Sequence, residues 1–183
     1  MATIISHAIV AGALASITSS SVSRSRLTFV LAFLAVLPDL DVIGFRLGIP
    51  YGHMLGHRGF THSILFAVLV AGITPALFFR GTRAFCRRWW ELATLAFLAT
   101  MSHGVLDAFT DAGLGVGFLI PFDETRYFAP WRPLATSPLS VIAFVNGPAL
   151  RILANEMVWI GVPLLIVMSA VHLFRWLGRS RGS

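Results

Sequence analysis

The fold is decided by the stretch LATLAFLATMSHGVLDAFTDA, residues 92–112. It is as long as an α-helix that crosses the hydrocarbon core of a bilayer, which takes about 20 predominantly apolar residues. It nevertheless contains His103 and Asp107, and ionisable side chains at membrane depth are costly unless they face a protein interior, a metal ion or a water-filled pocket. The segment therefore predicts a transmembrane helix that contributes to a functional site.

The composition of the whole chain also indicates a membrane protein. Of its 183 residues, 56% are hydrophobic and 12% are charged, and the mean hydropathy is +0.80. This is too apolar for an ordinary soluble domain. Because Cys86 is the one cysteine in the sequence, an internal disulfide and zinc sites built on several cysteines are excluded. A metal ion would have to be held by histidine and carboxylate side chains.

Five apolar segments approach the length of a membrane span. They cover residues 4–20, 27–47, 62–79, 92–112 and 156–177. The first is short and ends in a serine-rich stretch, like a signal peptide, but it lacks a basic leader, so we expect it to remain in the mature protein. The sequence predicts one all-α domain over residues 1–183, a polytopic transmembrane helical bundle of about five spans.

The connection between the last two segments, residues 113–155, is rich in glycine, proline and aromatic residues. It is too long for a simple turn and too apolar for a solvated linker. We expect it to fold back over the bundle as a partly structured extracytoplasmic cap. Residues 138–145 within it favour a short interfacial or re-entrant helix, which the sequence Asn146, Gly147, Pro148 would end.

Arginines predict the orientation, because they are enriched in short cytoplasmic loops. They cluster between the first two segments, between the third and fourth, and after the fifth, as Arg24, Arg26, Arg80, Arg83, Arg87, Arg88, Arg175, Arg179 and Arg181. An odd number of spans places these clusters and the C-terminus in the cytoplasm, and the N-terminus outside. The clusters lie at the ends of apolar runs, so the net charge of +6 indicates membrane orientation and no nucleic-acid partner.

The same topology gathers most of the candidate ligands on the extracytoplasmic side. Seven of the eight acidic residues, all but Glu91, and every histidine except His172 lie toward that side. His172 is assigned no role, and His53 is left out because it lies in a glycine-rich loop without partner spacing. Hydropathy alone therefore predicts a site at one end of the bundle.

His103 and Asp107 are four residues apart, so on a helix they project from one face and can close on a single ion. Asp111 would extend the row by one more turn. Imidazole and carboxylate without thiolate suit zinc, manganese or iron. The alternative is a His–Asp pair that only hydrogen-bonds along the helix, and the membrane setting favours the metal-ligand interpretation.

Two further motifs carry candidate ligands. In LPDLD, residues 37–41, Pro38 interrupts the helix, so that Asp39 and Asp41 need not point to opposite faces. One could ligate while the other orients a histidine, or they could form a polar cap at the helix end. In HRGFTHS, residues 57–63, His57 and His62 flank a bend that also offers Arg58 to an anion. Interfacial polar histidines are the alternative there.

The loop PFDETRYFAPWRPL, residues 121–134, mixes charged and aromatic side chains. It is typical of an interfacial aromatic belt. It also fits a lid in which Arg126 and Arg132 pair with a phosphate oxygen while Trp131 meets an acyl or isoprenoid chain. Both interpretations place the loop at the membrane surface.

Taken together, the segments ISHAIVAG, PDLD, HRGFTHS, SHGVLDAFTDAG and PFDETRYFAPWRP resemble the YdjM-like family of bacterial inner-membrane proteins. The resemblance runs in order over residues 6 to about 138 and leaves the fifth segment unmarked. The family is described as LexA-regulated, membrane-bound, metal-dependent hydrolases. The resemblance therefore implies a multi-pass protein of the bacterial inner membrane with a metal cofactor.

A more remote likeness is to the zinc-dependent phospholipase C and single-strand nuclease superfamily, whose helical bundle holds a zinc cluster. It implies metal ligation by His7, Asp39 or Asp41, His57 or His62, and His103 with Asp107. A lone histidine such as His7 is otherwise more often a packing residue. The residues that complete a third metal in those enzymes are missing after Asp107, where only Asp111 follows. One or two ions are implied, zinc first, with manganese or iron as alternatives.

These likenesses imply a hydrolase that uses a metal-activated water to cleave a phosphoester in a membrane lipid or lipid-linked substrate. Asp39 or Asp41 would orient a histidine or accept a proton, and Arg58, Arg126 and Arg132 would hold the phosphate. A structural or sensory metal site is the alternative from the binding class. An ion transporter is a third, but the cytoplasmic half offers only His172 and Glu91, which counts against it.

Overall fold

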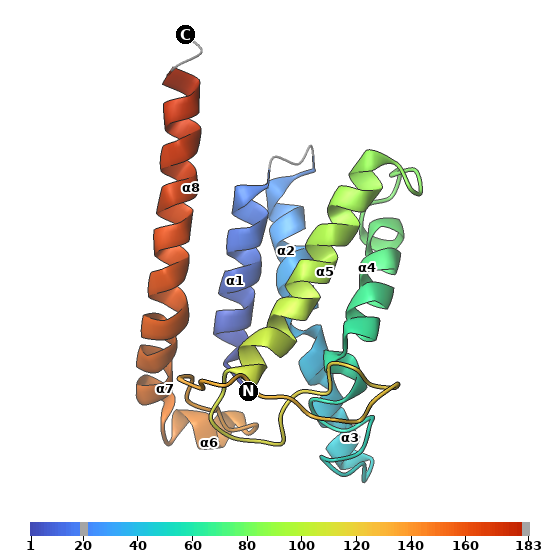
Figure 1. The fold of residues 1–183 in the computed structure, drawn as a ribbon, viewed down its shortest axis with the longest axis vertical. Helices are drawn as coiled ribbons and strands as arrows, with labels where there is room; N and C mark the ends of the chain where they lie inside the picture. The colour runs from blue at the N-terminus through green and yellow to red at the C-terminus, as the bar shows by residue number, and fades with distance from the viewer. Residues whose placement is uncertain (19–21, 181–183) are drawn as a thin grey trace.

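The computed structural model describes residues 1–18 and 22–180, and every regular element in these ranges is a helix (Figure 1). The predicted all-α class is thus confirmed. Two isolated backbone bridges, Thr110 with Leu134 and Val116 with Tyr127, tie loops together. Residues 19 and 20 of the first predicted span, and Arg181 of the last arginine cluster, lie outside the described residues.

The helices fall into a bundle and a separate C-terminal arm (Figure 1). The bundle is formed by α1 (Ile4–Ile17), α2 (Arg24–Val36), α4 (Ile64–Phe78) and α5 (Arg87–Ala108). Short elements at one end of it are η1 (Leu37–Val42), α3 (Ile43–Arg46) and η2 (Phe60–His62). The arm contains α6 (Val141–Val145), α7 (Ala149–Glu156), the π-helical η3 (Met157–Gly161) and α8 (Val162–Ser180).

Two continuous helices, Arg24–Arg46 and Ala149–Gly178, are long and apolar enough to cross a membrane. Ile4–Ile17 and Ile64–Phe78 are apolar but shorter. α5 has 22 residues, but charged side chains in its first turns and polar ones near its end lower its hydropathy. By length and composition, the described residues therefore contain two candidate spans where the sequence predicted about five.

Small side chains hold the bundle together. Ala11 and Ala15 of α1, Ala35 of α2, and Ala96 and Ala99 of α5 are fully or almost fully buried in one core cluster. Residues of this size let helix backbones approach closely, as is usual where helices pack within a membrane. Close packing of α1, α2 and α5 brings the polar residues at one end of these helices within reach of one another.

The connection after α5, residues 113–155, crosses the end of the bundle where η1 and η2 lie, and we call it the cap (Figure 1). Backbone hydrogen bonds join it to that end: Gly117 N donates to Arg58 O, Ile64 N to Phe118 O, and Ala129 N to Ala108 O. α8 stands beside α1 (Figure 1), and only 6% of the most apolar stretch of the continuous helix Ala149–Gly178 is buried. Its side chains therefore face outward, as expected for a helix covered by lipid.

Candidate metal centre

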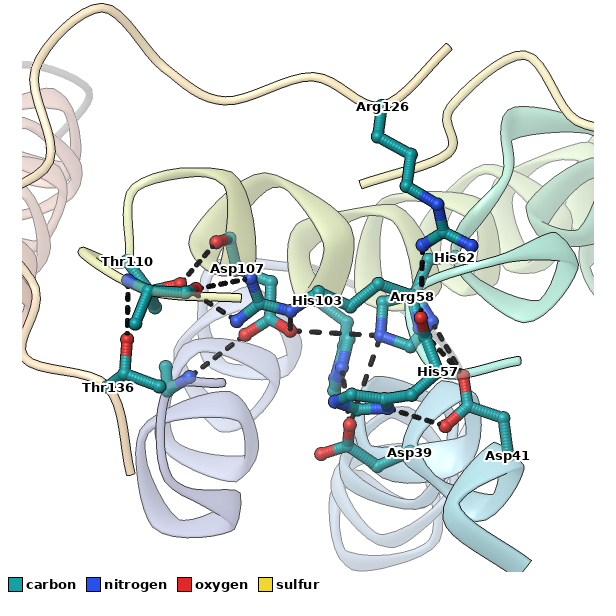
Figure 2. A network of polar contacts seen from close by, with 12 residues as sticks. Asp39, Asp41, His57, Arg58, His62, His103, Asp107, Thr110, Arg126 and Thr136 are labelled. Atoms are coloured by element: carbon teal, nitrogen blue, oxygen red, sulfur yellow. Dashed lines mark hydrogen bonds and ion pairs between the residues drawn. The ribbon is translucent and has the colours of Figure 1, made fainter. Parts of the chain in front are cut away.

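Four side chains from three separate parts of the chain meet at the capped end of the bundle (Figure 2). Asp39 comes from η1, His62 from η2, and His103 and Asp107 from adjacent turns of α5. Each offers one ligand atom, and these atoms all lie within 4.8 Å of one another. The four residues are at most 6% exposed. The arrangement is therefore a buried cluster of two imidazoles and two carboxylates.

The protonation of His103 is fixed by a backbone contact. Its Nδ1 lies 2.7 Å from the carbonyl oxygen of Ala35, which can only accept, so Nδ1 carries the proton. In a neutral ring Nε2 is then a bare lone pair, and it faces Asp39 Oδ1 at 3.2 Å. Two acceptors at this distance need either a proton or a metal ion between them.

His62 has the same arrangement. Its Nδ1 lies 3.2 Å from Asp41 Oδ2, which leaves Nε2 directed at Asp39 Oδ1, 3.9 Å away, and at Asp107 Oδ2, 3.8 Å away. A neutral ring with its proton on Nδ1 presents the Nε2 lone pair to these oxygens, which is the form that binds metal ions.

The cluster fits a divalent cation. Nε2 of His62 and His103 and both oxygens of Asp39 are buried without a hydrogen-bond partner in the described part of the chain. Oδ2 of Asp107 is also buried and lies in an ion pair with Arg58. Buried polar atoms are normally paired, so a convergent group of unpaired ones indicates a ligand. Ligand bonds of about 2.0–2.2 Å place tetrahedral neighbours about 3.3–3.6 Å apart. The closest separations in the cluster, 3.2 to 3.9 Å, bracket that value.

His7, from the first turn of α1, lies against this cluster. Its ring stacks on that of His103 with 3.8 Å between centroids, and its Nε2 is 3.8 Å from Asp107 Oδ1. Both ring nitrogens are buried without a hydrogen-bond partner among the described residues. The structure thus brings His7 to the cluster, where it approaches Oδ1 of Asp107 while His62 approaches Oδ2.

Asp41 and His57 form a hydrogen-bonded network behind His62 (Figure 2). Asp41 Oδ1 lies 2.7 Å from His57 Nδ1, and its Oδ2 accepts from Thr61 Oγ1 and from the backbone N of Arg58. Asp41, His57 and His62 are close enough to hold an ion of their own. However, both Asp41 oxygens already accept hydrogen bonds, so the geometry favours Asp41 as the carboxylate that orients His62.

Replacement of Asp41 by asparagine should weaken metal binding about 10- to 100-fold, because a ligating histidine that loses its carboxylate partner loses orientation and basicity. The affinity can be measured by competition with a chelator. Asp123→Asn is the matched control, since Asp123 bonds Thr125 on the surface of the cap. Equal affinity in both variants would argue against the orienting role.

Asp111 does not join the cluster. α5 ends at Ala108, so the four-residue periodicity that carries His103 and Asp107 stops before it reaches position 111. Asp111 is instead exposed, and its Oδ1 accepts from the backbone N and the Oγ1 of Thr136. The prediction of Asp111 as a ligand is corrected here.

The residues predicted to bind substrate are engaged elsewhere. Arg58 is fully buried and has a positive φ of 61°. Its guanidinium contacts Asp107 Oδ2 at 3.0 Å and donates to Thr110 Oγ1 and Ala112 O. Arg126 donates to the carbonyl oxygens of His57 and His53. Both arginines therefore hold the structure together and are not free to bind a phosphate.

The two remaining predicted substrate residues lie on the surface of the cap. The guanidinium of Arg132 lies over the ring of Phe128, 4.6 Å from its centroid. Trp131 packs edge-on against Trp159 of η3, with 4.7 Å between ring centroids. No contact with the metal-ligand cluster is recorded for either among the described residues, so the structure gives them no place in the site.

Sequence reasoning missed Glu156, which is 2% exposed. Its carboxylate accepts from the backbone N and Oγ1 of Thr3 and from Ser6 Oγ. It thereby caps the N-terminus of α1, where a negative charge is favourable. Because Ala2 N donates to Asp107 Oδ1 at 2.9 Å, the same segment supports the cluster. An acidic residue at the start of an apolar segment was the available signal.

Glu156→Ala should destabilise the protein, because it leaves buried donors on Thr3 and Ser6 unpaired, at a cost of about 1–3 kcal/mol for each. The expected result is a lower midpoint of thermal unfolding in detergent. Glu124→Ala, at an exposed position of the cap, should leave the midpoint unchanged. Similar midpoints for the two variants would contradict the capping role.

Comparison with known proteins gives two matches. A family model described as YdjM inner membrane protein matches residues 1–179. The chain is also 36% identical over 168 residues to the inner membrane protein YbcI of Escherichia coli (strain K12), which covers 92% of this chain and 95% of the relative. No solved structure matches the chain. The likeness to the phospholipase C superfamily therefore stays a resemblance of motifs.

Proposed function

Because the chain belongs to the YdjM family of inner membrane proteins, we propose that it is a membrane-embedded, metal-dependent hydrolase that cleaves a phosphoester bond in a lipid-linked substrate. The observation that carries the proposal is the pair of buried imidazole nitrogens without a hydrogen-bond partner, Nε2 of His62 and of His103, that face the carboxylates of Asp39 and Asp107. The proposal does not include a soluble nucleic acid as substrate.

The donor set favours zinc, with manganese or iron as alternatives, because imidazole and carboxylate suit these ions. When bound, such an ion supplies Lewis acidity, which makes water more acidic and stabilises charge on phosphoryl oxygens. Asp39, His62, His103 and Asp107 would hold it. Asp41 orients His62, and Arg58 holds Asp107. Asp39 has two oxygens without hydrogen bonds, so one can ligate while the other accepts a proton.

We further propose a multi-pass topology with the N-terminus and the site outside and the C-terminus in the cytoplasm. The residues that lie at the two ends of α1 support it. His7 lies in the first turn of this helix, whereas Arg24 and Arg175 donate to Ser16 O at its other end. The site and these arginines are thus at opposite ends of one apolar helix, and arginines mark the cytoplasmic side. A lipid substrate would approach from the outer leaflet.

The test is a hydrolysis screen on full-length protein purified in detergent, with phospholipids and isoprenoid phosphates as substrates. We expect release of headgroup or phosphate that is lost after EDTA treatment and restored by zinc or manganese. His103→Ala should be inactive, whereas His172→Ala, which changes an exposed histidine on α8, should retain activity. Hydrolysis that persists without metal would refute the proposal.

A closed structural or sensory metal site is the second candidate. The burial of all four ligand residues, at most 6% exposed, favours it, since structural sites are coordinatively closed while catalytic sites keep a position open. Tightly bound metal combined with no turnover of any lipid phosphoester would support this candidate over the hydrolase.

A further inference from the structure

The cap carries an exposed apolar surface next to the site. It consists of Leu139, Val141, Ile142, Val145 and Leu150, which are 47%, 74%, 73%, 64% and 84% exposed. We call these residues the cap patch. All five residues of α6 are apolar, so this short helix has no polar face to turn toward water. Apolar surface of this kind normally marks an interaction site.

The position of the cap patch indicates what covers it. α6 lies beside α7, at the end of the arm opposite the C-terminus, and the chain then runs through α7 into α8 (Figure 1). Ala149–Gly178 forms one continuous helix that is long and apolar enough to cross a membrane. The cap patch is therefore continuous with a lipid-covered surface and lies where that helix would leave the hydrocarbon core, so its partner is the bilayer itself.

An apolar hollow separates the cap patch from α1. It has a volume of about 150 Å³ and is lined by Ile4, Ile5, Leu139, Val141 and Phe144. Pockets for whole small molecules measure about 300–1,000 Å³, so this one suits a segment of an acyl chain. Met1 and Thr3 also line it, and Ala2 between them donates to Asp107 Oδ1. The hollow thus lies one residue away from a carboxylate of the metal-ligand cluster.

A second hollow of about 350 Å³, with a mixed polar and apolar lining, adjoins the apolar one. The two share Ser137 and Pro138, and the second is also lined by Asp111, Thr136 and Arg151. Arg151, on α7, is exposed, while Asp111 already accepts two hydrogen bonds from Thr136. A guanidinium is a strong partner for phosphate oxygens. The hollow therefore offers one arginine to an anionic group beside a slot for an apolar chain.

We propose that the two hollows form one phospholipid-binding site, in which an acyl chain occupies the apolar hollow and the phosphate pairs with Arg151. The site takes its lipid from the outer leaflet through the cap patch. The lipid bound here would be the substrate of the metal centre, and this step rests on the proposed function. The binding of the lipid does not depend on it. The proposal assigns to Arg151 the contact with phosphate that Arg58 and Arg126 cannot make.

The test measures binding to full-length, EDTA-treated protein in detergent, so that no hydrolysis interferes. The probe is dihexanoylphosphatidylglycerol, whose short chains keep it monomeric, and titration calorimetry reports the affinity. Leu139→Asp removes apolar contact from the slot, and Arg151→Gln removes the cation. Each should weaken binding about tenfold or more, since a tenfold change corresponds to the loss of one modest apolar or charged contact.

Phe122→Asp is the matched control, because Phe122 is an 83% exposed aromatic residue of the same connection that lines neither hollow. Its affinity should equal that of the unmodified protein. Leu139→Ala, with a smaller expected loss, replaces Leu139→Asp if helicity by circular dichroism shows that the latter misfolds. Unchanged affinity in both Leu139 and Arg151 variants would overturn the site.

Inorganic phosphate serves as a second probe that distinguishes a lipid headgroup from a free anion. It should bind at least tenfold more weakly than the lipid, and equal affinity would overturn the acyl slot. Lipid binding that depends on Arg151 in a protein without hydrolase activity would leave this inference standing and remove the proposed function. Hydrolysis with the same KM in the Arg151 and Leu139 variants as in the unmodified protein would leave the proposed function standing and remove this inference.

Discussion

Substitution of His103 or Asp107 by alanine is expected to abolish stoichiometric metal in protein purified from membranes. Each substitution removes one of the four buried side chains that would hold the ion, whose candidate ligand atoms lie within 4.8 Å of one another. Even partners outside the coordination shell cost about 10- to 100-fold in affinity, so loss of a direct ligand should exceed about a hundredfold. Elemental analysis after exhaustive dialysis gives the metal content per chain.

His172→Ala is the control for this experiment. It removes an imidazole from the same chain at an exposed position of α8, where Nδ1 contacts the backbone oxygen of Met168 in its own helix. Its metal content should match that of the unmodified protein. Circular dichroism must show that the His103 and Asp107 variants keep their helices. Stoichiometric metal in folded variants would remove these residues as ligands, and with them the proposed centre.

Substitution of Arg58 by methionine should have the largest effect on stability. Arg58 and Asp107 are both fully buried, with 3.0 Å between Nε and Oδ2. Removal of one partner from a buried ion pair costs about 3–5 kcal/mol, because the other charge stays behind uncompensated. For a chain of this size we expect the unfolding midpoint to fall by about 6–20 °C. Scanning calorimetry or tryptophan fluorescence in detergent measures the midpoint.

The metal should change the size of this effect. A divalent ion beside Asp107 compensates the carboxylate that Arg58 no longer pairs, so the midpoint should fall further in EDTA-treated protein than in metal-loaded protein. Arg132→Met is the control, because its guanidinium lies over Phe128 on the surface of the cap. A surface change of this kind stays within about 0.5 kcal/mol. An equal loss for Arg58→Met with and without metal would contradict the link between Arg58 and the metal centre.

The helical class and the core of the site follow from local sequence. Long apolar stretches predict helices, and the four-residue spacing of His103 and Asp107 places both on one face of α5, where the structure has them. The spacing argument holds only while the helix continues. It was wrong for Asp111, because nothing in the apolar pattern marks the end of α5 at Ala108.

The choice between neighbouring candidates needed the tertiary structure. Asp39 and Asp41 look equivalent in sequence, as do His57 and His62. The 3-10 turn η1 directs Asp39 toward α5 and Asp41 toward His57. Asp41 Oδ1 lies 2.7 Å from His57 Nδ1, within hydrogen-bond distance. Arg58 looked free for an anion, but its positive φ turns it inward to Asp107. The partners of Glu156, Thr3 and Ser6, could not be predicted from local sequence because they are about 150 positions away.

The sequence by itself determined that this is an apolar, all-helical chain with its histidines and carboxylates toward one end, because helix formation and hydropathy depend on residues a few positions apart. Only the tertiary structure decided which of these groups meet. The contacts that orient His62, His103 and Asp107 come from η1, α2 and the segment before α1. Such contacts depend on how whole helices pack, and short-range periodicity carries no information about that.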